Sequence, residues 1–75
     1  MDYVVVIHKA EEGGYWAEVP ALPGCFAQGE SLEDLLNEAR EAILSHLEAL
    51  KEDGHAPPLE PVIIATVRTE QPAGA

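Results

Sequence analysis

Residues 14–34 predict two short strands joined by a tight turn, followed directly by the start of a helix. This segment constrains the fold more than any other part of the chain. Tyr15, Ala17 and Val19 alternate with Trp16 and Glu18 at its beginning, a period of two that predicts a strand with one face better buried than the other. Pro23 and Gly24 suit the two central positions of a type II turn, the second of which requires a positive φ. Residues 25–28 are then expected to return as a second strand, and Gly29 to end it.

A long amphipathic helix is predicted directly after this pair of strands. Ser31 and Asp34 have the three-residue spacing of a capping box, with Asp in place of the more usual Glu or Gln. Apolar side chains then recur at three- and four-residue steps, which places them on one stripe of a helix. These residues are Leu32, Leu35, Leu36, Ala39, Ile43, Leu47 and Leu50. Gly54 supplies a stop, so the helix is expected to cover one apolar surface.

Two β-branched runs flank this unit, at residues 3–7 and 61–67. The first has no polar alternation, which is typical of a strand covered on both faces. Residues 11–14 are expected to form the turn between the first two strands. The predicted fold is therefore α+β with the order β-β-β-α-β, in which a right-handed helical crossover returns the last strand parallel to the first. We expect one domain over residues 1–68 and a flexible tail over residues 69–75.

The chain is short for the apolar surface that it carries. A domain of 75 residues hides only about 60% of the surface of its extended chain, so an additional source of burial is expected. The single helix covers one face of the sheet, yet the first strand is apolar on both faces. Soluble monomers seldom leave such a patch uncovered. We therefore expect a homodimer or a higher oligomer, or a protein partner on that face.

The charge balance narrows the range of partners. The sequence carries 14 acidic and 4 basic residues, for a formal net charge of −10. Because the basic residues are scattered, direct binding of nucleic acid is disfavoured, whereas an acidic surface suits either simple solubility or a basic protein partner. The single cysteine excludes an intramolecular disulfide, and no apolar run approaches the roughly 18 residues of a membrane span. We expect a cytoplasmic protein without membrane contact.

Residues that could carry chemistry are few. Cys25 lies in an apolar segment, where a lone cysteine is more often a small buried hydrophobe than a nucleophile. His8, His46 and His55 lack the spacing of metal ligands. A two-metal site would have to draw on scattered carboxylates that match no catalytic motif. The candidates for it are Asp2, Glu18, Glu38 and Asp53. We therefore expect no enzyme activity, no cofactor and no metal.

The first hairpin carries the candidate binding residues. Tyr15 and Trp16 take opposite faces of one strand, so at most one of them joins the core beneath the helix. We assign Trp16 to a partner interface, together with acidic residues of the same hairpin. These are Glu11, Glu12 and Glu18. Structural roles in the turn, the strand end and the helix cap are assigned to Pro23, Gly24, Gly29 and Ser31.

Five segments occur together in an informative order. They are Gly14-Tyr15-Trp16-Ala17-Glu18-Val19-Pro20, Leu22-Pro23-Gly24-Cys25, Gln28-Gly29, Ser31-Leu32-Glu33-Asp34 and Asn37-Glu38-Ala39-Arg40-Glu41-Ala42. In this combination the chain resembles the N-terminal domain of HicB-family antitoxins. With the hydrophobic first strand and the Pro57-Pro58 linker, the similarity spans roughly residues 2–67.

The resemblance implies a partial ribonuclease-H-like fold without catalytic function, whose role in the family is to bind and mask a HicA toxin. HicA-type toxins are small, basic, RNA-cleaving proteins, and the acidic balance of this chain fits such a partner. Typical HicB proteins continue into a C-terminal segment that binds operator DNA, whereas this sequence ends at Ala75. Two other functions compete with the antitoxin role: an oligomeric regulatory or scaffold domain without a toxin, and a small metal-dependent nuclease.

Overall fold

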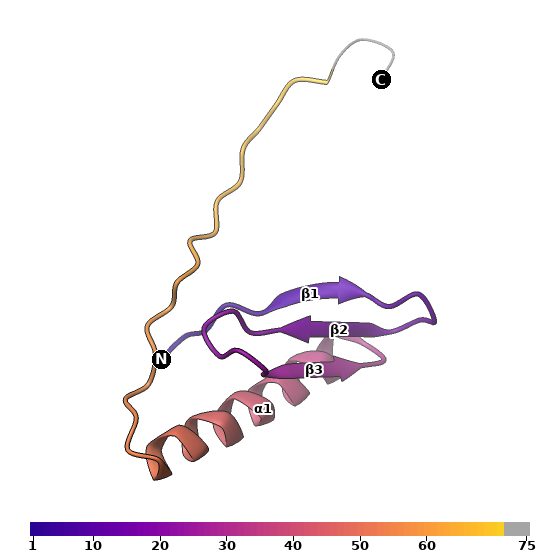
Figure 1. The fold of residues 1–75 in the computed structure, drawn as a ribbon. Helices are drawn as coiled ribbons and strands as arrows, with labels where there is room; N and C mark the ends of the chain where they lie inside the picture. Colours follow the sequence, from indigo (N-terminus) through magenta and orange to yellow (C-terminus); the bar gives the residue numbers. More distant parts are fainter. Residues whose placement is uncertain (72–75) are drawn as a thin grey trace.

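A three-stranded antiparallel sheet precedes a single helix in the computed structural model, which describes residues 1–71 (Figure 1). The strands are β1 (Val6–Lys9), β2 (Tyr15–Glu18) and β3 (Phe26–Gly29), and they lie side by side in sequence order. Both neighbouring pairs are antiparallel. β1 and β3 are therefore the two edges of the sheet.

The hairpin between β1 and β2 fixes the register of the sheet. The backbone N–H of Gly13 donates to the carbonyl of Ala10 at 3.1 Å, and the N–H of Ala10 donates to the carbonyl of Gly14 at 3.1 Å. His8 consequently lies opposite Trp16. Directly opposite residues share a face of a sheet, so these two rings lie on the same face.

The connection between β2 and β3 contains the predicted type II turn. The N–H of Cys25 donates to the carbonyl of Leu22 at 3.0 Å, and Gly24 has a φ of 85°. A second turn precedes it, because the N–H of Leu22 donates to the carbonyl of Val19 at 3.0 Å. Together the two turns reverse the chain, so that β3 returns beside β2.

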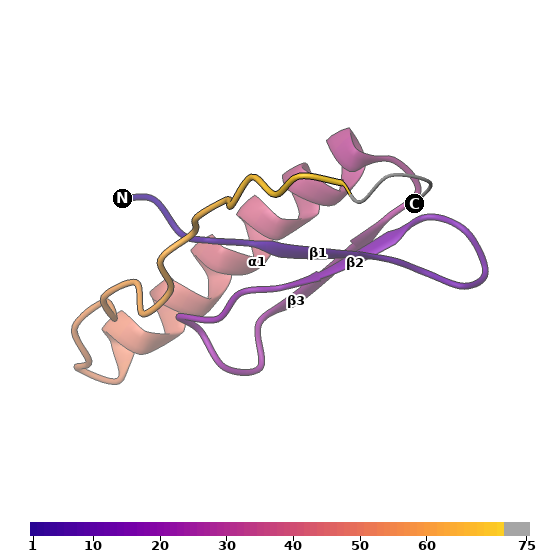
Figure 2. The ribbon, with the colours of Figure 1, turned by 90° about the horizontal axis from the view of Figure 1, so that it is seen from above.

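α1 (Leu32–Glu52) begins and ends where the sequence indicates. The Ser31 hydroxyl oxygen accepts a hydrogen bond from the N–H of Asp34 at 3.1 Å, which satisfies one of the free donors of the first turn. At the other end, Gly54 has a φ of 80°, the left-handed conformation that terminates many helices. The helix crosses beneath one face of the sheet, as Figure 1 and Figure 2 show.

The core lies between the helix and the sheet. Ala17 on β2 and Leu35 on α1 are fully buried, and Ala39 is nearly so. A second buried cluster fills the space at the β2–β3 connection, and the C-terminal half of α1 packs against it. The cluster consists of Val19, Ala21, Leu22 and Cys25, and the helix residues packed on it are Ala42, Ile43, Leu47 and Leu50. The inner part of the predicted helix stripe is thus confirmed, whereas Leu32 and Leu36 are about half exposed.

A very close approach between β3 and α1 sets the spacing of these two layers. A Cβ atom placed on Gly29 would lie 2.5 Å from the backbone nitrogen of Leu35. Real Cβ contacts are essentially never this short, so only glycine fits here. Gly29 therefore ends β3, as predicted, and also holds the strand directly against the start of the helix.

The α+β class and the succession of three strands and one helix are confirmed, but the predicted fourth strand is not part of the sheet. Residues 55–71, here called the arm, contain no helix or strand and lead away from the sheet and helix (Figure 1). The run at residues 61–67 has the composition of a strand, but a strand also needs a paired edge, and the sheet of the described residues contains only β1, β2 and β3.

One predicted boundary also differs from the structure. The first strand was expected at residues 3–7, whereas β1 begins only at Val6, because β2 ends at Glu18 and its chain turns away before it could pair with the preceding residues. Of the predicted tail, residues 69–71 form neither helix nor strand, and residues 72–75 lie outside the described part of the chain.

Candidate functional site

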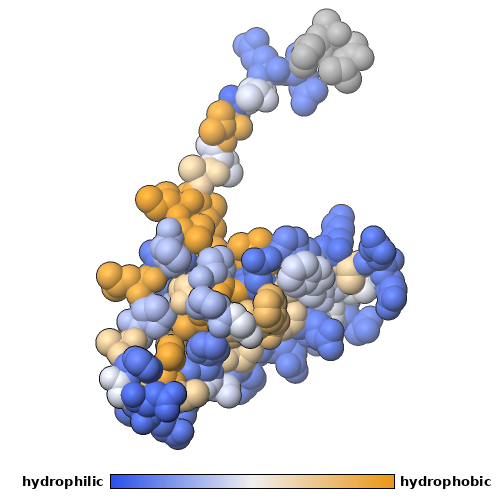
Figure 3. Space-filling view, viewed as in Figure 1, coloured by the Kyte–Doolittle hydropathy of each residue, from blue (hydrophilic) through white to orange (hydrophobic). Residues whose placement is uncertain are grey.

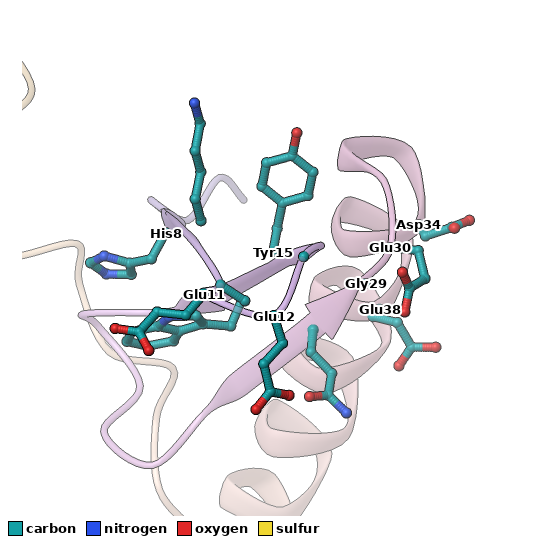
Figure 4. A pocket seen from close by; sticks show the side chains of 13 residues that line it. His8, Glu11, Glu12, Tyr15, Gly29, Glu30, Asp34 and Glu38 are labelled. Carbon is teal, nitrogen blue, oxygen red and sulfur yellow. The ribbon is translucent and has the colours of Figure 1, made fainter.

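An open concavity of about 1160 Å³ lies at the end of the sheet that carries the β1–β2 hairpin. The hairpin, the end of β3 and the first half of α1 contribute its lining (Figure 4). Five carboxylate side chains belong to this lining, two from the hairpin, one from the segment between β3 and α1 and two from α1. They are Glu11, Glu12, Glu30, Asp34 and Glu38.

The aromatic part of the concavity is held in place by contacts within the sheet. The rings of His8 and Trp16 stack with their centroids 4.1 Å apart and their planes 16° apart. On its other side, His8 Nε2 lies 2.9 Å from a carboxylate oxygen of Glu18. The imidazole covers one side of the indole, and 38% of Trp16 remains exposed. Tryptophan is among the residues that most often anchor protein interfaces.

The charge of the concavity is strongly negative. Lys9 is the one lysine or arginine in its lining, against the five carboxylates. Glu33 and Asp34 lie in the first turn of α1, at the positive end of the helix dipole. Such a surface attracts basic groups and repels the phosphates of nucleic acids.

Three of the four predicted binding residues line the concavity, and the fourth lies outside its lining. Glu11, Glu12 and Trp16 line the concavity, whereas Glu18 contacts it only through its interaction with His8. Sequence reasoning missed His8 and the three acidic residues Glu30, Asp34 and Glu38. The last three could have been found from the glycine stop before the helix, because that stop turns the first turn of α1 back toward the hairpin. Whether these residues contact a partner stays a prediction.

Tyr15 and Trp16 lie on opposite faces of β2, as predicted. Trp16 shares the outer face with His8, and Tyr15 shares the face of the buried Ala17, next to the helix. The outer face also carries Phe26, which is opposite Glu18 and 61% exposed. Apolar surface therefore remains open on this face of the described chain.

The reactive side chains are dispersed or buried. Cys25 is a free cysteine that is only 4% exposed, and its burial raises the pKa of the thiol above the usual value. The thiol form therefore dominates at neutral pH, as expected for a buried apolar residue rather than a nucleophile.

The candidate metal ligands do not come together. Within residues 1–71 no three side chains of His, Cys, Asp or Glu form a group that could hold a metal ion. The four carboxylates considered for a two-metal site lie before β1, on β2, on α1 and at the helix C-cap, at Asp2, Glu18, Glu38 and Asp53. His8 is on β1, while His46 lies on α1 and His55 follows it. None of the helices in the described range is long and apolar enough to span a membrane.

Comparison with known proteins identifies the class of protein to which this chain belongs. Residues 3–73 match the family described as HicB_like antitoxin of bacterial toxin-antitoxin system. The chain therefore belongs to the HicB-like antitoxin family.

Two relatives show how far the similarity extends along the chain. A UPF0150 protein of Thermoplasma acidophilum is 49% identical over 51 residues, which cover 68% of this chain and 74% of the relative. Antitoxin HicB 1 of Photorhabdus laumondii is 36% identical over 59 residues, which cover 79% of this chain but 38% of that antitoxin.

Solved structures show the same fold. A HicA3 and HicB3 toxin–antitoxin complex contains a chain that matches with a TM-score of 0.67 and 35% identity, over 84% of this chain and 72% of that one. The N-terminal domain of the Burkholderia pseudomallei antitoxin HicB matches with a TM-score of 0.63 and 36% identity, over 75% of this chain and 64% of that one.

Proposed function

We propose that this protein is an antitoxin-type module that binds and masks a small, basic, HicA-like RNA-cleaving toxin in the cytoplasm, without catalytic activity of its own. The observation that carries the proposal is the acidic concavity around Trp16, with five carboxylates and a single lysine in its lining. The occurrence of a structural relative in a complex of HicA3 with HicB3 supports the same partner class.

The carboxylates and the tryptophan of the concavity are expected to contribute to binding in different ways. Its carboxylates stand on exposed positions, where they accelerate encounter with a basic surface and select against acidic partners more than they add affinity. Trp16 supplies an aromatic surface that loses little conformational freedom on binding. Masking then follows sterically, because a bound antitoxin covers the basic surface with which a toxin would approach RNA.

The experiment is affinity purification of the tagged chain from extract of its native cells, identification of any small basic protein that co-purifies, and an RNA-cleavage assay of that protein with and without the chain. We expect the chain to co-purify with the basic protein and to suppress its cleavage of RNA. Association should slow as salt rises from about 0.05 M to about 0.3 M, because exposed charges are screened more strongly. Failure to recover a complex, or cleavage that continues within it, would contradict the proposal.

A charge-reversal pair tests the concavity itself. Glu11→Lys with Glu12→Lys should lower the association rate without unfolding the domain. The matched control is Glu48→Lys with Glu52→Lys, which makes the same charge change at exposed positions near the other end of α1. If both pairs of substitutions lowered the association rate equally, the rate would depend on the net charge of the chain and not on the concavity.

An oligomeric regulatory domain without a toxin is the second candidate, and the exposed apolar side chains of the arm favour it. The same co-purification separates the two functions. Recovery of the chain with copies of itself alone, and of no basic protein, would favour this second candidate.

A further inference from the structure

The arm presents apolar side chains to solvent in both directions. Ile63, Ile64 and Val67 are 94%, 71% and 85% exposed. Adjacent residues of an extended chain point to opposite sides, so Ile63 and Ile64 make both faces of the arm apolar. Figure 3 shows hydrophobic side chains along the arm and at the place where it leaves the domain. A strand that is apolar on both faces is typical of one paired inside a covered sheet.

The sheet has a free edge that could pair with such a strand. The N–H of Ala10 points to β2, where it bonds to Gly14. Because the direction of backbone polar groups alternates along a strand, the groups of His8 and Val6 also point to β2, and those of Ile7 and Lys9 point outward. Within residues 1–71 no strand pairs with this outer edge of β1. Unpaired backbone groups of this kind are a template for strand addition.

An apolar groove of about 440 Å³ lies between the chain that leads into β1 and the flank of α1. Val5, Leu36 and Leu44 are among the residues that line it. Leu36 and Leu44 are 50% and 52% exposed, so a large part of their apolar surface is uncovered in the described chain. A strand added to the outer edge of β1 would lie above this groove and cover both leucines.

The arm of the same chain is directed away from that position. One carboxylate oxygen of Glu60 accepts a hydrogen bond from the N–H of Val4 at 2.7 Å, and the other accepts from Val62 at 3.1 Å. Pro57, Pro58 and Pro61 flank Glu60 and restrict the backbone on both sides of it, because each proline fixes its own φ and lacks an N–H. Beyond this anchor the arm extends away from the domain (Figure 1).

From these observations we propose that two copies of this chain exchange their arms. Residues 61–67 of each copy pair with the outer edge of β1 of the other copy, and their inward side chains fill the groove beside α1. In a two-fold symmetric exchange the same contact forms twice. Each arm then pairs with the β1 edge of the other copy and fills the groove of that copy. This proposal is independent of the proposed toxin binding.

Light scattering during size-exclusion chromatography tests the exchange. The wild-type chain should have twice its mass of 8.1 kDa at micromolar concentration. Ile63→Asp with Val67→Asp should raise the dissociation constant of the dimer about 100-fold or more, because two apolar side chains can no longer be buried. Thr69→Asp with Gln71→Asp adds the same charge beyond the pairing segment and should leave the dimer intact. A monomeric wild-type chain, or a dimer insensitive to the first pair, would overturn the proposal.

Disulfide trapping gives a result even if the charged variant fails to fold. In a Cys25→Ser background, one chain carries Leu44→Cys and a second carries Ile63→Cys, with Ile64→Cys as the comparison on the opposite face of the arm. Oxidation of the mixed chains should yield a cross-linked dimer of one chain of each kind. When both substitutions are placed in one chain, arm exchange produces covalent dimers, whereas a covalent monomer would mean that the arm folds back on its own groove and would refute the exchange.

Discussion

Replacing Gly29 by alanine tests how rigidly the sheet is held against the helix. The added Cβ would lie 2.5 Å from the nitrogen and 2.8 Å from the Cα of Leu35, and 3.0 Å from the carbonyl carbon of Asp34. All three are backbone atoms of the first helical turn, so no side-chain rotation can relieve the contact. Gly29 is not among the glycines with positive φ, so the substitution introduces a clash without backbone strain.

The size of the effect follows from the cost of overpacking. Forcing extra atoms into a packed site costs about 1–3 kcal/mol and occasionally more. A gain of about 0.4–1 kcal/mol from the stiffer unfolded chain offsets part of this cost. Because the clash is with backbone and Leu35 is fully buried, we expect a cost at the upper end, about 3 kcal/mol, and hence a net loss of about 2–2.6 kcal/mol. At about 4–8 °C per kcal/mol, the melting temperature should fall by about 8–21 °C.

Urea denaturation followed by circular dichroism at 222 nm measures the loss, because α1 supplies the helical signal, and all variants are compared at one protein concentration. Gly54 provides the control, since its φ is 80° and no atom would lie within 4 Å of an added Cβ. Gly54→Asn should be better tolerated than Gly54→Ala, because asparagine accepts positive φ more readily. At Gly29 asparagine should bring no such relief. Unfolding free energies of Gly29→Ala and wild type within about 0.5 kcal/mol would refute the reasoning, because they would fall in the range of ordinary surface substitutions.

Three further changes probe the local structure. Gly24→Val should lower the free energy of unfolding by about 1–3 kcal/mol, because valine is strained at the φ of 85°, and an unchanged urea midpoint would contradict this. Ser31→Ala removes the acceptor of the Asp34 N–H and should cost about 1 kcal/mol in thermal unfolding, with no change expected if solvent already satisfied that donor. Burial raises the pKa of Cys25, so less thiolate is present, and iodoacetamide should label the native chain at about pH 8 more slowly than the unfolded one. Cys25→Ser should retain the native circular dichroism spectrum, and loss of that spectrum would show that the thiol is needed for packing.

Elements governed by local chemistry could be predicted from the sequence. The type II turn depends on a proline and on a glycine that accepts positive φ, and both Pro23 and Gly24 are adjacent in the chain. The start of α1 depends on one hydroxyl group and an N–H three residues later, which are again neighbours in sequence. The helix itself follows from the periodicity of its apolar side chains. No contact between distant segments is needed for any of these predictions.

Features that depend on distant segments were predicted less well. The run at residues 61–67 has the right composition for a strand, but its pairing depends on an edge that lies more than fifty residues away in the chain, and composition does not specify which copy supplies that edge. Likewise, Glu30 and Asp34 join Glu11 in one concavity only because Gly29 allows β3 to touch the helix. That contact is visible in three dimensions and has no signal in sequence beyond the glycine itself.

The two surfaces proposed for binding are separate in the fold, and this separation lets one small chain use both. The acidic concavity and the apolar groove have no lining residue in common. The concavity belongs to the hairpin and the first turns of α1, whereas the groove belongs to the residues before β1 and to the middle of the helix. Arm exchange would use the outer backbone edge of β1 and leave Glu11, Glu12 and Trp16 uncovered. A dimer of this kind would enlarge a core that is small for an isolated domain, and it would display two acidic concavities that basic partners could occupy without displacing either arm.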